Sequence, residues 1–208
     1  MAKLLMVKAN DRPADQSVSV RMYETFLHAY REAHPDDQVE VLDLSQIELP
    51  YYGGKAISGL YKMNQGEELT APEGQAARLV QRYMDQFLGS DKIAFAFPLW
   101  NCTVPAPLIT YMSYLTQAGK TFKFTSQGPI GLVGDKKVAL LNARGGNYSI
   151  EVMAPYEMAV TYMRNMTGLW GVRHPEAVII EGHHQHGGDA NDLIDRGLRD
   201  TAALALRF

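Results

Sequence analysis

Short apolar runs alternate with longer amphipathic segments along this chain. Five apolar runs have the length of a strand, and four of them are nearly continuous in apolar residues. They are Leu4–Val7, Val39–Leu42, Ile93–Phe97, Val138–Leu141 and Ala177–Ile180. Between and after them, four segments place apolar residues at helical spacing, namely 20–30, 79–87, 108–115 and 194–205. Continuous apolar strands are typical of a sheet that helices cover on both faces.

This alternation of strands and helices predicts the α/β class. Parallel strands joined by right-handed helical crossovers form a doubly wound sheet, and five strands favour the flavodoxin-like variant. Two connections, 45–71 and 120–134, are too long for the simple alternation and are typical of lids, interfaces or mobile loops. We found no internal repeat and no linker, so we expect residues 1–208 to form a single domain.

A stretch without Asp, Glu, Lys or Arg runs from Ile93 to Gly119 and invites comparison with a membrane span. Three prolines and Asn101 argue against that interpretation. Pro98 interrupts the apolar run, whereas Pro105 and Pro107 suit the first turn of a helix. The stretch is therefore predicted to be a strand, an irregular loop and a helix, and we expect no membrane partner.

The overall charge and the cysteine content bear on the binding partners and the cellular compartment to be expected. A net charge of −3 gives no electrostatic reason to expect nucleic acid binding. The single cysteine, Cys102, excludes an intrachain disulfide and fits a reducing compartment. The apolar run near the N-terminus is too short for the hydrophobic region of a signal peptide. We expect a cytoplasmic protein.

Three loops that follow strands are predicted to meet at the carboxyl edge of the sheet, where open α/β folds bind ligands. The first contains Ser17 and Ser19 just before and within the start of a helix. Two hydroxyls and the free amides of a helix start suit a phosphate monoester, although Ser17 also fits the simpler role of helix cap. Neither G-x-G-x-x-G nor G-x-x-x-x-G-K-[ST] occurs, which argues against a dinucleotide pyrophosphate site.

The second loop, 98–103, exposes Leu99, Trp100 and Asn101, a flat apolar surface beside an amide. This combination suits a planar heteroaromatic ring with a polar edge, although Trp100 also suits simple core or interface packing. Cys102 is either a nucleophile or an inert buried thiol.

The third loop, 142–149, contains Gly145 and Gly146, which permit close backbone approach to a ligand or form an ordinary turn. After the fifth apolar run comes a histidine cluster of His183, His184 and His186. A zinc or nickel site is one interpretation, but the spacing lacks the pattern of known metal sites, so no metal is predicted. Histidines at the rim of a ligand pocket and histidines without a role are the alternatives.

The motifs in these loops together resemble one family. The segments 97–101, 105–108, 118–122, 127–129 and 143–146 look like those of the FMN-dependent NADH-azoreductases, also called quinone oxidoreductases, nearly end to end. The resemblance implies a flavodoxin-like homodimer with FMN sites at the interface. It also implies a ping-pong cycle in which NADH or NADPH reduces FMN, and an azo dye or quinone reoxidises it.

The resemblance also implies roles for individual residues. Ser17, Val18 and Ser19 would hold the phosphate of FMN; the segment 98–102 would line one edge of the ring; and 142–146 would meet its polar side. The full set of implied cofactor-binding residues is Asn10, Ser17, Val18, Ser19, Pro98, Leu99, Trp100, Asn101, Cys102, Asn142, Ala143, Arg144, Gly145, Gly146 and Tyr148. No side chain is implied as a catalyst, because the flavin performs the electron transfer.

Three residues are candidate substrate contacts: His183, Tyr148 and Phe124. The sequence departs from the family pattern at Asn10, where a small residue or His is common, and at Cys102, where relatives often have an aromatic residue. Two alternatives share the fold: a flavodoxin-like electron-transfer protein without direct NAD(P)H activity, and a protein that binds no flavin.

Overall fold

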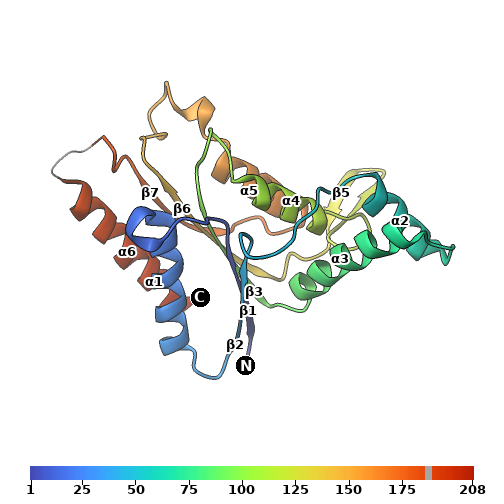
Figure 1. Ribbon diagram of the computed structural model, residues 1–208. Coiled ribbons are helices and arrows are strands. Elements are labelled where there is room, and N and C mark those ends of the chain that lie inside the picture. The colour runs from blue at the N-terminus through green and yellow to red at the C-terminus, as the bar shows by residue number, and fades with distance from the viewer. Residues whose placement is uncertain (186–188) are drawn as a thin grey trace.

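The computed structural model describes residues 1–185 and 189–208 and contains a five-stranded parallel sheet with the strand order β2-β1-β3-β6-β7 (Figure 1). The strands of this sheet are β1 (Lys3–Lys8), β2 (Gln38–Asp43), β3 (Lys92–Pro98), β6 (Lys137–Arg144) and β7 (Glu176–Glu181). Each contains one of the predicted apolar runs. The order is that of the flavodoxin-like fold, and its direction reverses between β1 and β3. The predicted fold class is confirmed.

Helices cover both faces of the sheet (Figure 1). On one face lie α1 (Val18–Ala33) and α6 (Ala190–Arg207), and on the other lie α3 (Ala71–Leu88), α4 (Ala106–Leu115) and α5 (Ala159–Leu169). Successive residues of a strand point to opposite faces, so Leu4 and Met6 pack with α1 and α6, whereas Leu5 and Val7 pack with the other helices. This double cover explains why the central strands are continuously apolar.

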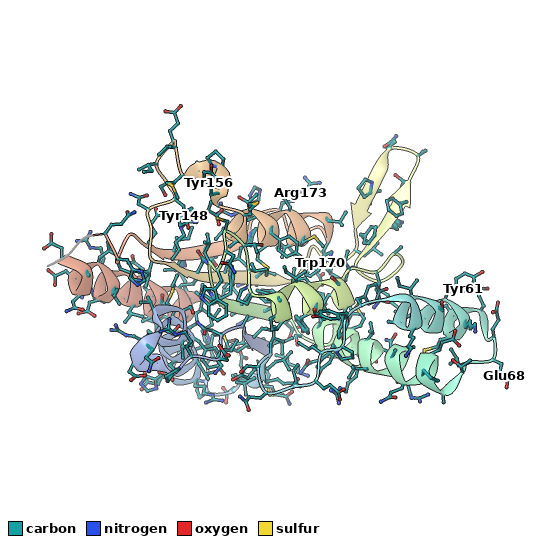
Figure 2. The ribbon with its side chains drawn as sticks, turned by 45° about the horizontal axis from the view of Figure 1, so that its top comes forward. Tyr61, Glu68, Tyr148, Tyr156, Trp170 and Arg173 are labelled. Atoms are coloured by element: carbon teal, nitrogen blue, oxygen red, sulfur yellow. The ribbon has the colours of Figure 1, made fainter. Side chains whose placement is uncertain are left out.

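The two long connections contain regular structure that the sequence pattern did not predict. The first contains helix α2 (Gly54–Gln65), which packs against α3, and the second forms the hairpin of β4 (Phe122–Thr125) and β5 (Gly128–Gly131). Figure 2 shows this hairpin standing out from the body, apart from Tyr148 and Tyr156. Four-residue strands with glycine and proline are too short to show an alternating pattern.

Strand β6 extends three residues further than its apolar run, to Arg144. Asn142, Ala143 and Arg144, which were predicted to lie in a loop, therefore lie in a strand. A strand continues through polar residues where their side chains find partners, and both Asn142 and Arg144 do so here. Among the described residues, no helix is both long and apolar enough to cross a membrane.

Gly197 sets how closely α6 approaches β7. A Cβ atom at this position would clash with the side chain of Ile180, whereas a Cβ at Gly168 in α5 would meet nothing within 4 Å. We expect Gly197→Ala to destabilise the protein by about 1–3 kcal/mol through overpacking. Gly168→Ala should instead stabilise it by about 0.5–1 kcal/mol, because alanine favours a helix. Urea unfolding of both variants checks this, and shifts of the same sign would contradict it.

Candidate functional site

A pocket of about 560 Å³ lies at the carboxyl edge of the sheet, beside the point where strand order reverses. Its walls come from the loops after β1, β3, β6 and β7 and from the start of α6. This volume is within the range of small-molecule and cofactor sites. Another pocket, of about 500 Å³, lies between the segment 48–55 and helix α3, and none of the predicted site residues lines it.

The structure brings most of the predicted site residues to this pocket. Those that line it are Asn10, Ser17, Val18, Ser19, Pro98, Leu99, Trp100, Ala143, Arg144, Gly145, Gly146 and His183. Those that do not line it are Asn101, Cys102, Asn142, Tyr148 and Phe124. Phe124 is 75% exposed on the projecting hairpin. Tyr148 lies beyond Gly146, and its ring stacks over the guanidinium of Arg144.

His184, one of the histidines proposed for the rim of a pocket, also lines it, whereas several other lining residues were not predicted, including Arg12, Gln16, Arg21 and Asn191. Arg12 and Gln16 belong to the same loop as Ser17, so their proximity was a usable signal. Asn191 and the nearby Ile194 come from α6, whose first turn lies beside α1. That packing joins residues far apart in the chain, and no local pattern reveals it.

The loop after β1 presents a polar cluster at one end of the pocket. Ser17 is the N-cap of α1, and its hydroxyl accepts a hydrogen bond from the amide of Val20 at 3.4 Å. The Asn10 side chain, buried to 4% exposure, donates to the hydroxyls of Ser17 and Ser19 at 2.7 and 2.9 Å. The amides of the first helical turn have no partner within a helix. The predicted cap is confirmed, and a dense set of hydrogen-bond donors surrounds it.

The loop after β3 is held in a tight turn between Trp100 and Thr103, whose backbones exchange two hydrogen bonds. The two central residues, Asn101 and Cys102, have φ angles of 49° and 67°. This left-handed conformation costs residues other than glycine about 1–2 kcal/mol. The turn reverses the direction of the chain, and it leaves Trp100 37% exposed on the wall of the pocket.

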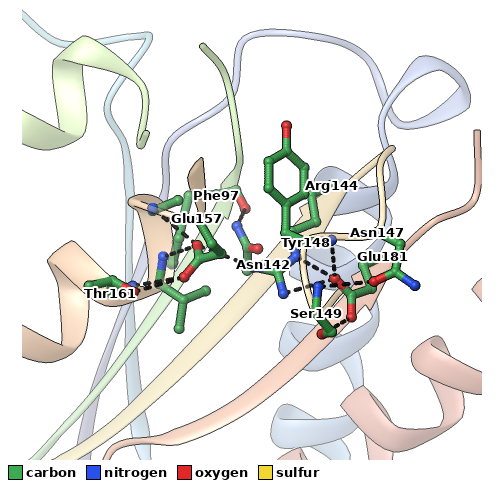
Figure 3. Close-up of polar contacts among 11 residues, drawn as sticks. Phe97, Asn142, Arg144, Asn147, Tyr148, Ser149, Glu157, Thr161 and Glu181 are labelled. Carbon is green, nitrogen blue, oxygen red and sulfur yellow. Dashed lines mark hydrogen bonds and ion pairs between the residues drawn. The ribbon is translucent and has the colours of Figure 1, made fainter. Parts of the chain in front are cut away.

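Arg144 is the most strongly engaged polar side chain near the pocket. Its guanidinium is only 5% exposed and lies between two carboxylates, Glu181 at 2.9 Å and Glu157 at 3.2 Å (Figure 3). Glu157 also accepts hydrogen bonds from the amides of Val160 and Thr161 at the start of α5. The side chain of Arg144 therefore joins β6, β7 and α5, and both of its carboxylate partners come from outside the three predicted loops.

Glu181 also fixes the segment that follows Gly146. It accepts hydrogen bonds from the amide of Tyr148 at 3.0 Å and from the hydroxyl of Ser149 (Figure 3). Burial raises the pKa of the Glu181 carboxyl, but Ser149, Tyr148 and Arg144 together outweigh burial and hold this pKa below its usual value. The folded protein thus stabilises the charged form of the Glu181 carboxyl group.

Asn142 stabilises the same edge of the sheet from the protein interior. It is fully buried, and its amide donates to the carbonyl of Phe97 at 3.1 Å (Figure 3). It connects the ends of β3 and β6 at the place where both lead into the pocket.

The two histidines after β7 pack against each other and against Gly145. Their rings are 4.6 Å apart, and a Cβ at Gly145 would clash with the imidazole of His184. Burial, followed by the proximity of His184, lowers the pKa of His183. Among the described residues, no group of three or more His, Cys, Asp or Glu side chains could hold a metal ion. His186, the third member of the sequence cluster, lies outside the described residues.

Fold and pocket together define a flavodoxin-like protein, and a family model described as flavodoxin-like fold matches residues 2–204. FMN-dependent NADH:quinone oxidoreductase 1 of Bacillus cereus is 57% identical over 208 residues, which is 100% of both chains. The corresponding enzyme of Shouchella clausii is 55% identical over the same span. The crystal structure of an azoreductase from Bacillus anthracis matches with 52% identity and a TM-score of 0.97, covering 100% of both chains. The chain belongs to this family of FMN-dependent NADH:quinone oxidoreductases and azoreductases.

Because the pKa of Glu181 is lowered on folding, its stabilising contribution is present above the unfolded pKa of about 4.3 and is lost as pH falls through the folded value. We expect Glu181→Gln to be less stable than the parent protein at pH 7, and the difference to shrink below about pH 4. Urea unfolding at several pH values measures it. Glu151→Gln, at an exposed position without an ion pair among the described residues, is the matched control. A difference independent of pH would contradict the prediction.

Proposed function

We propose that this protein is an FMN-dependent oxidoreductase that transfers electrons from NADH or NADPH to quinones and azo compounds. The observation that carries the proposal is the pocket at the carboxyl edge of the sheet, which has a cluster of hydrogen-bond donors at one end and a flat apolar wall at the other. The full-length similarity to FMN-dependent NADH:quinone oxidoreductases supports it.

The donor end suits the phosphate of FMN. Ser17 and Ser19 supply hydroxyls, and the first amides of α1 point toward the same place with the positive end of the helix dipole. Arg12 and Arg21 add positive charge to this end of the pocket, and Asp15 adds one negative charge. A phosphate monoester matches this arrangement better than a dinucleotide, because the loop lacks the glycines that a pyrophosphate requires.

The opposite end suits the isoalloxazine ring. Pro98, Leu99 and Trp100 form an apolar wall, and the backbone of Gly145 and Gly146 forms the facing edge. The amides of Gly145 and Gly146 donate to no acceptor among the described residues, so they are available to the polar edge of a ring. Backbone amides in this position would stabilise negative charge on a reduced flavin.

The chemistry that FMN supplies when bound is two-electron transfer between a nicotinamide and a quinone or azo group. The residues of the chain bind and orient the cofactor and exclude water from one face of its ring. We infer that donor and acceptor use this face in turn, which gives a ping-pong cycle. The single cysteine, which forms no disulfide, fits a cytoplasmic setting.

We also infer that two copies associate with the pocket at their interface. The support is a set of exposed apolar side chains without a cover: Trp100, Val152, Tyr156 and Met158 near the pocket, and Phe124 and Ile130 on the hairpin. Apolar surface of this kind marks interaction sites. Phe124 does not line the pocket of its own chain, so its substrate contact would be made across such an interface.

The experiment that tests the function is a visible spectrum followed by a steady-state assay. We expect the purified protein, after incubation with FMN, to show flavin absorption bands and to oxidise NADH in the presence of a quinone. A protein that binds FMN but does not consume NADH would be an electron-transfer protein instead. A protein that shows no flavin bands would refute the proposal.

A second prediction concerns the phosphate end. Replacing Ser17 and Ser19 together with Ala removes two hydrogen bonds to a charged group, each about 1.5–3 kcal/mol. The double variant should therefore lose most of its preference for FMN over riboflavin, while riboflavin binding changes little. Fluorescence titration with both flavins measures the preference, and Ser58→Ala, at an exposed position of α2, is the control. An unchanged ratio of the two affinities would exclude the two serines as phosphate ligands.

A further inference from the structure

Asn10 has an unusual position among the polar residues of the pocket. It is 4% exposed, and its side chain makes three hydrogen bonds within one loop and the first turn of α1. We propose that Asn10 is a positioning residue that directs the hydroxyl protons of Ser17 and Ser19 toward a phosphate. This inference rests on the proposed function, because the phosphate is that of FMN.

The orientation of the Asn10 amide follows from its neighbour Arg12. The backbone N–H of Arg12 lies 3.0 Å from Oδ1 of Asn10, and an N–H group can only donate. The oxygen of the amide must therefore face Arg12, and the NH₂ group must face the two serines. Both of its N–H groups are then used, at 2.7 Å to Ser17 and 2.9 Å to Ser19.

The serine hydroxyls consequently act as acceptors toward Asn10 and as donors elsewhere. Oγ of Ser17 accepts from Asn10 and also from the amide of Val20 at 3.4 Å, which occupies both of its lone pairs. It cannot also accept from Ser19, so a hydrogen bond between these two oxygens, 3.2 Å apart, can only run from the Ser17 hydroxyl to Oγ of Ser19. The Ser19 hydroxyl, only 1% exposed, is thus left with a proton and no acceptor among the described residues.

A buried hydroxyl without an acceptor is costly, and an anionic ligand removes the cost. Phosphate oxygens accept hydrogen bonds and never donate them when fully ionised, so a site that has only donors left to offer selects them. Asn10 has no remaining donor of its own for the ligand. Its effect on binding must pass through the two serines, which distinguishes it from a direct phosphate ligand.

Asn10→Asp tests this assignment, because a carboxylate has nearly the same shape but only accepts. The variant still accepts from Arg12, but its other oxygen draws both serine protons away from the ligand. We expect FMN affinity to fall at least about 100-fold, or about ten-fold for each hydrogen bond lost, and riboflavin affinity to change less than about three-fold. Retained riboflavin binding also shows that the variant folds.

A mutant cycle separates proton direction from simple charge repulsion. In the parent protein, changing both serines to Ala should reduce FMN affinity at least about 100-fold; in the Asn10→Asp background the same change should reduce it less than about three-fold. Gln16→Glu adds one negative charge to the same loop without touching the serines. In that background, the serine change should keep its full effect.

The outcomes are distinct. If the parent protein binds no FMN, the proposed function fails; if it binds FMN but the serine change costs the same in the Asn10→Asp background as in the parent protein, the positioning role fails. Should the Asn10→Asp variant not fold, Asn10→Ala provides the second measurement. Loss of both N–H donors should lower FMN affinity about ten-fold and spare riboflavin, and equal losses for both flavins would overturn the proposal.

Discussion

The buried guanidinium of Arg144 constrains the whole functional edge of this protein. A charged group removed from water is stable only when it is paired, and here Glu157 and Glu181 supply the pairing from two other parts of the chain. Those same carboxylates hold the start of α5 and the segment after Gly146. Met158, next to Glu157, donates its amide to the carbonyl of Cys102, so the constraint reaches the loop after β3. The walls of the pocket are thus connected through one ionic group.

The sheet was predictable because burial on both faces leaves a direct mark on the sequence. Runs such as Val138–Leu141 are typical of strands between two helical layers, and their carboxyl ends locate the pocket. The partners of Arg144 were not predictable, since they depend on how β7 and α5 pack. The hairpin of β4 and β5 was not predicted because its strands are only four residues long. Helices α2 and α5 were not predicted either, because each buries only a few residues, several of them small or polar, and shows no long apolar stripe.

For the site itself, the sequence located the loops better than the directions of their side chains. Ser17, Trp100 and Gly145 line the pocket, whereas Cys102 and Asn142 neighbour it without lining it. The turn at Asn101 and Cys102 accounts for part of this difference, because two successive left-handed residues reverse the chain within two positions. Backbone strain of this kind is found at functional sites where surrounding contacts maintain it. No pattern of residue types predicts that a cysteine adopts the left-handed conformation.

The order of the pocket's walls along the chain has a consequence for synthesis. The polar end, where we place the phosphate, is complete in the chain by Arg21, but the opposite wall needs Glu181 to hold the segment after Gly146, and Asn191 lines the pocket from α6. Chains emerge from the ribosome N-terminus first, and domains fold as units. A nascent chain therefore exposes an incomplete pocket until nearly all of its residues have emerged. Binding of a cofactor in this pocket would therefore follow translation, and a transcript truncated before β7 would yield a chain with the loop after β1 but without the complete pocket.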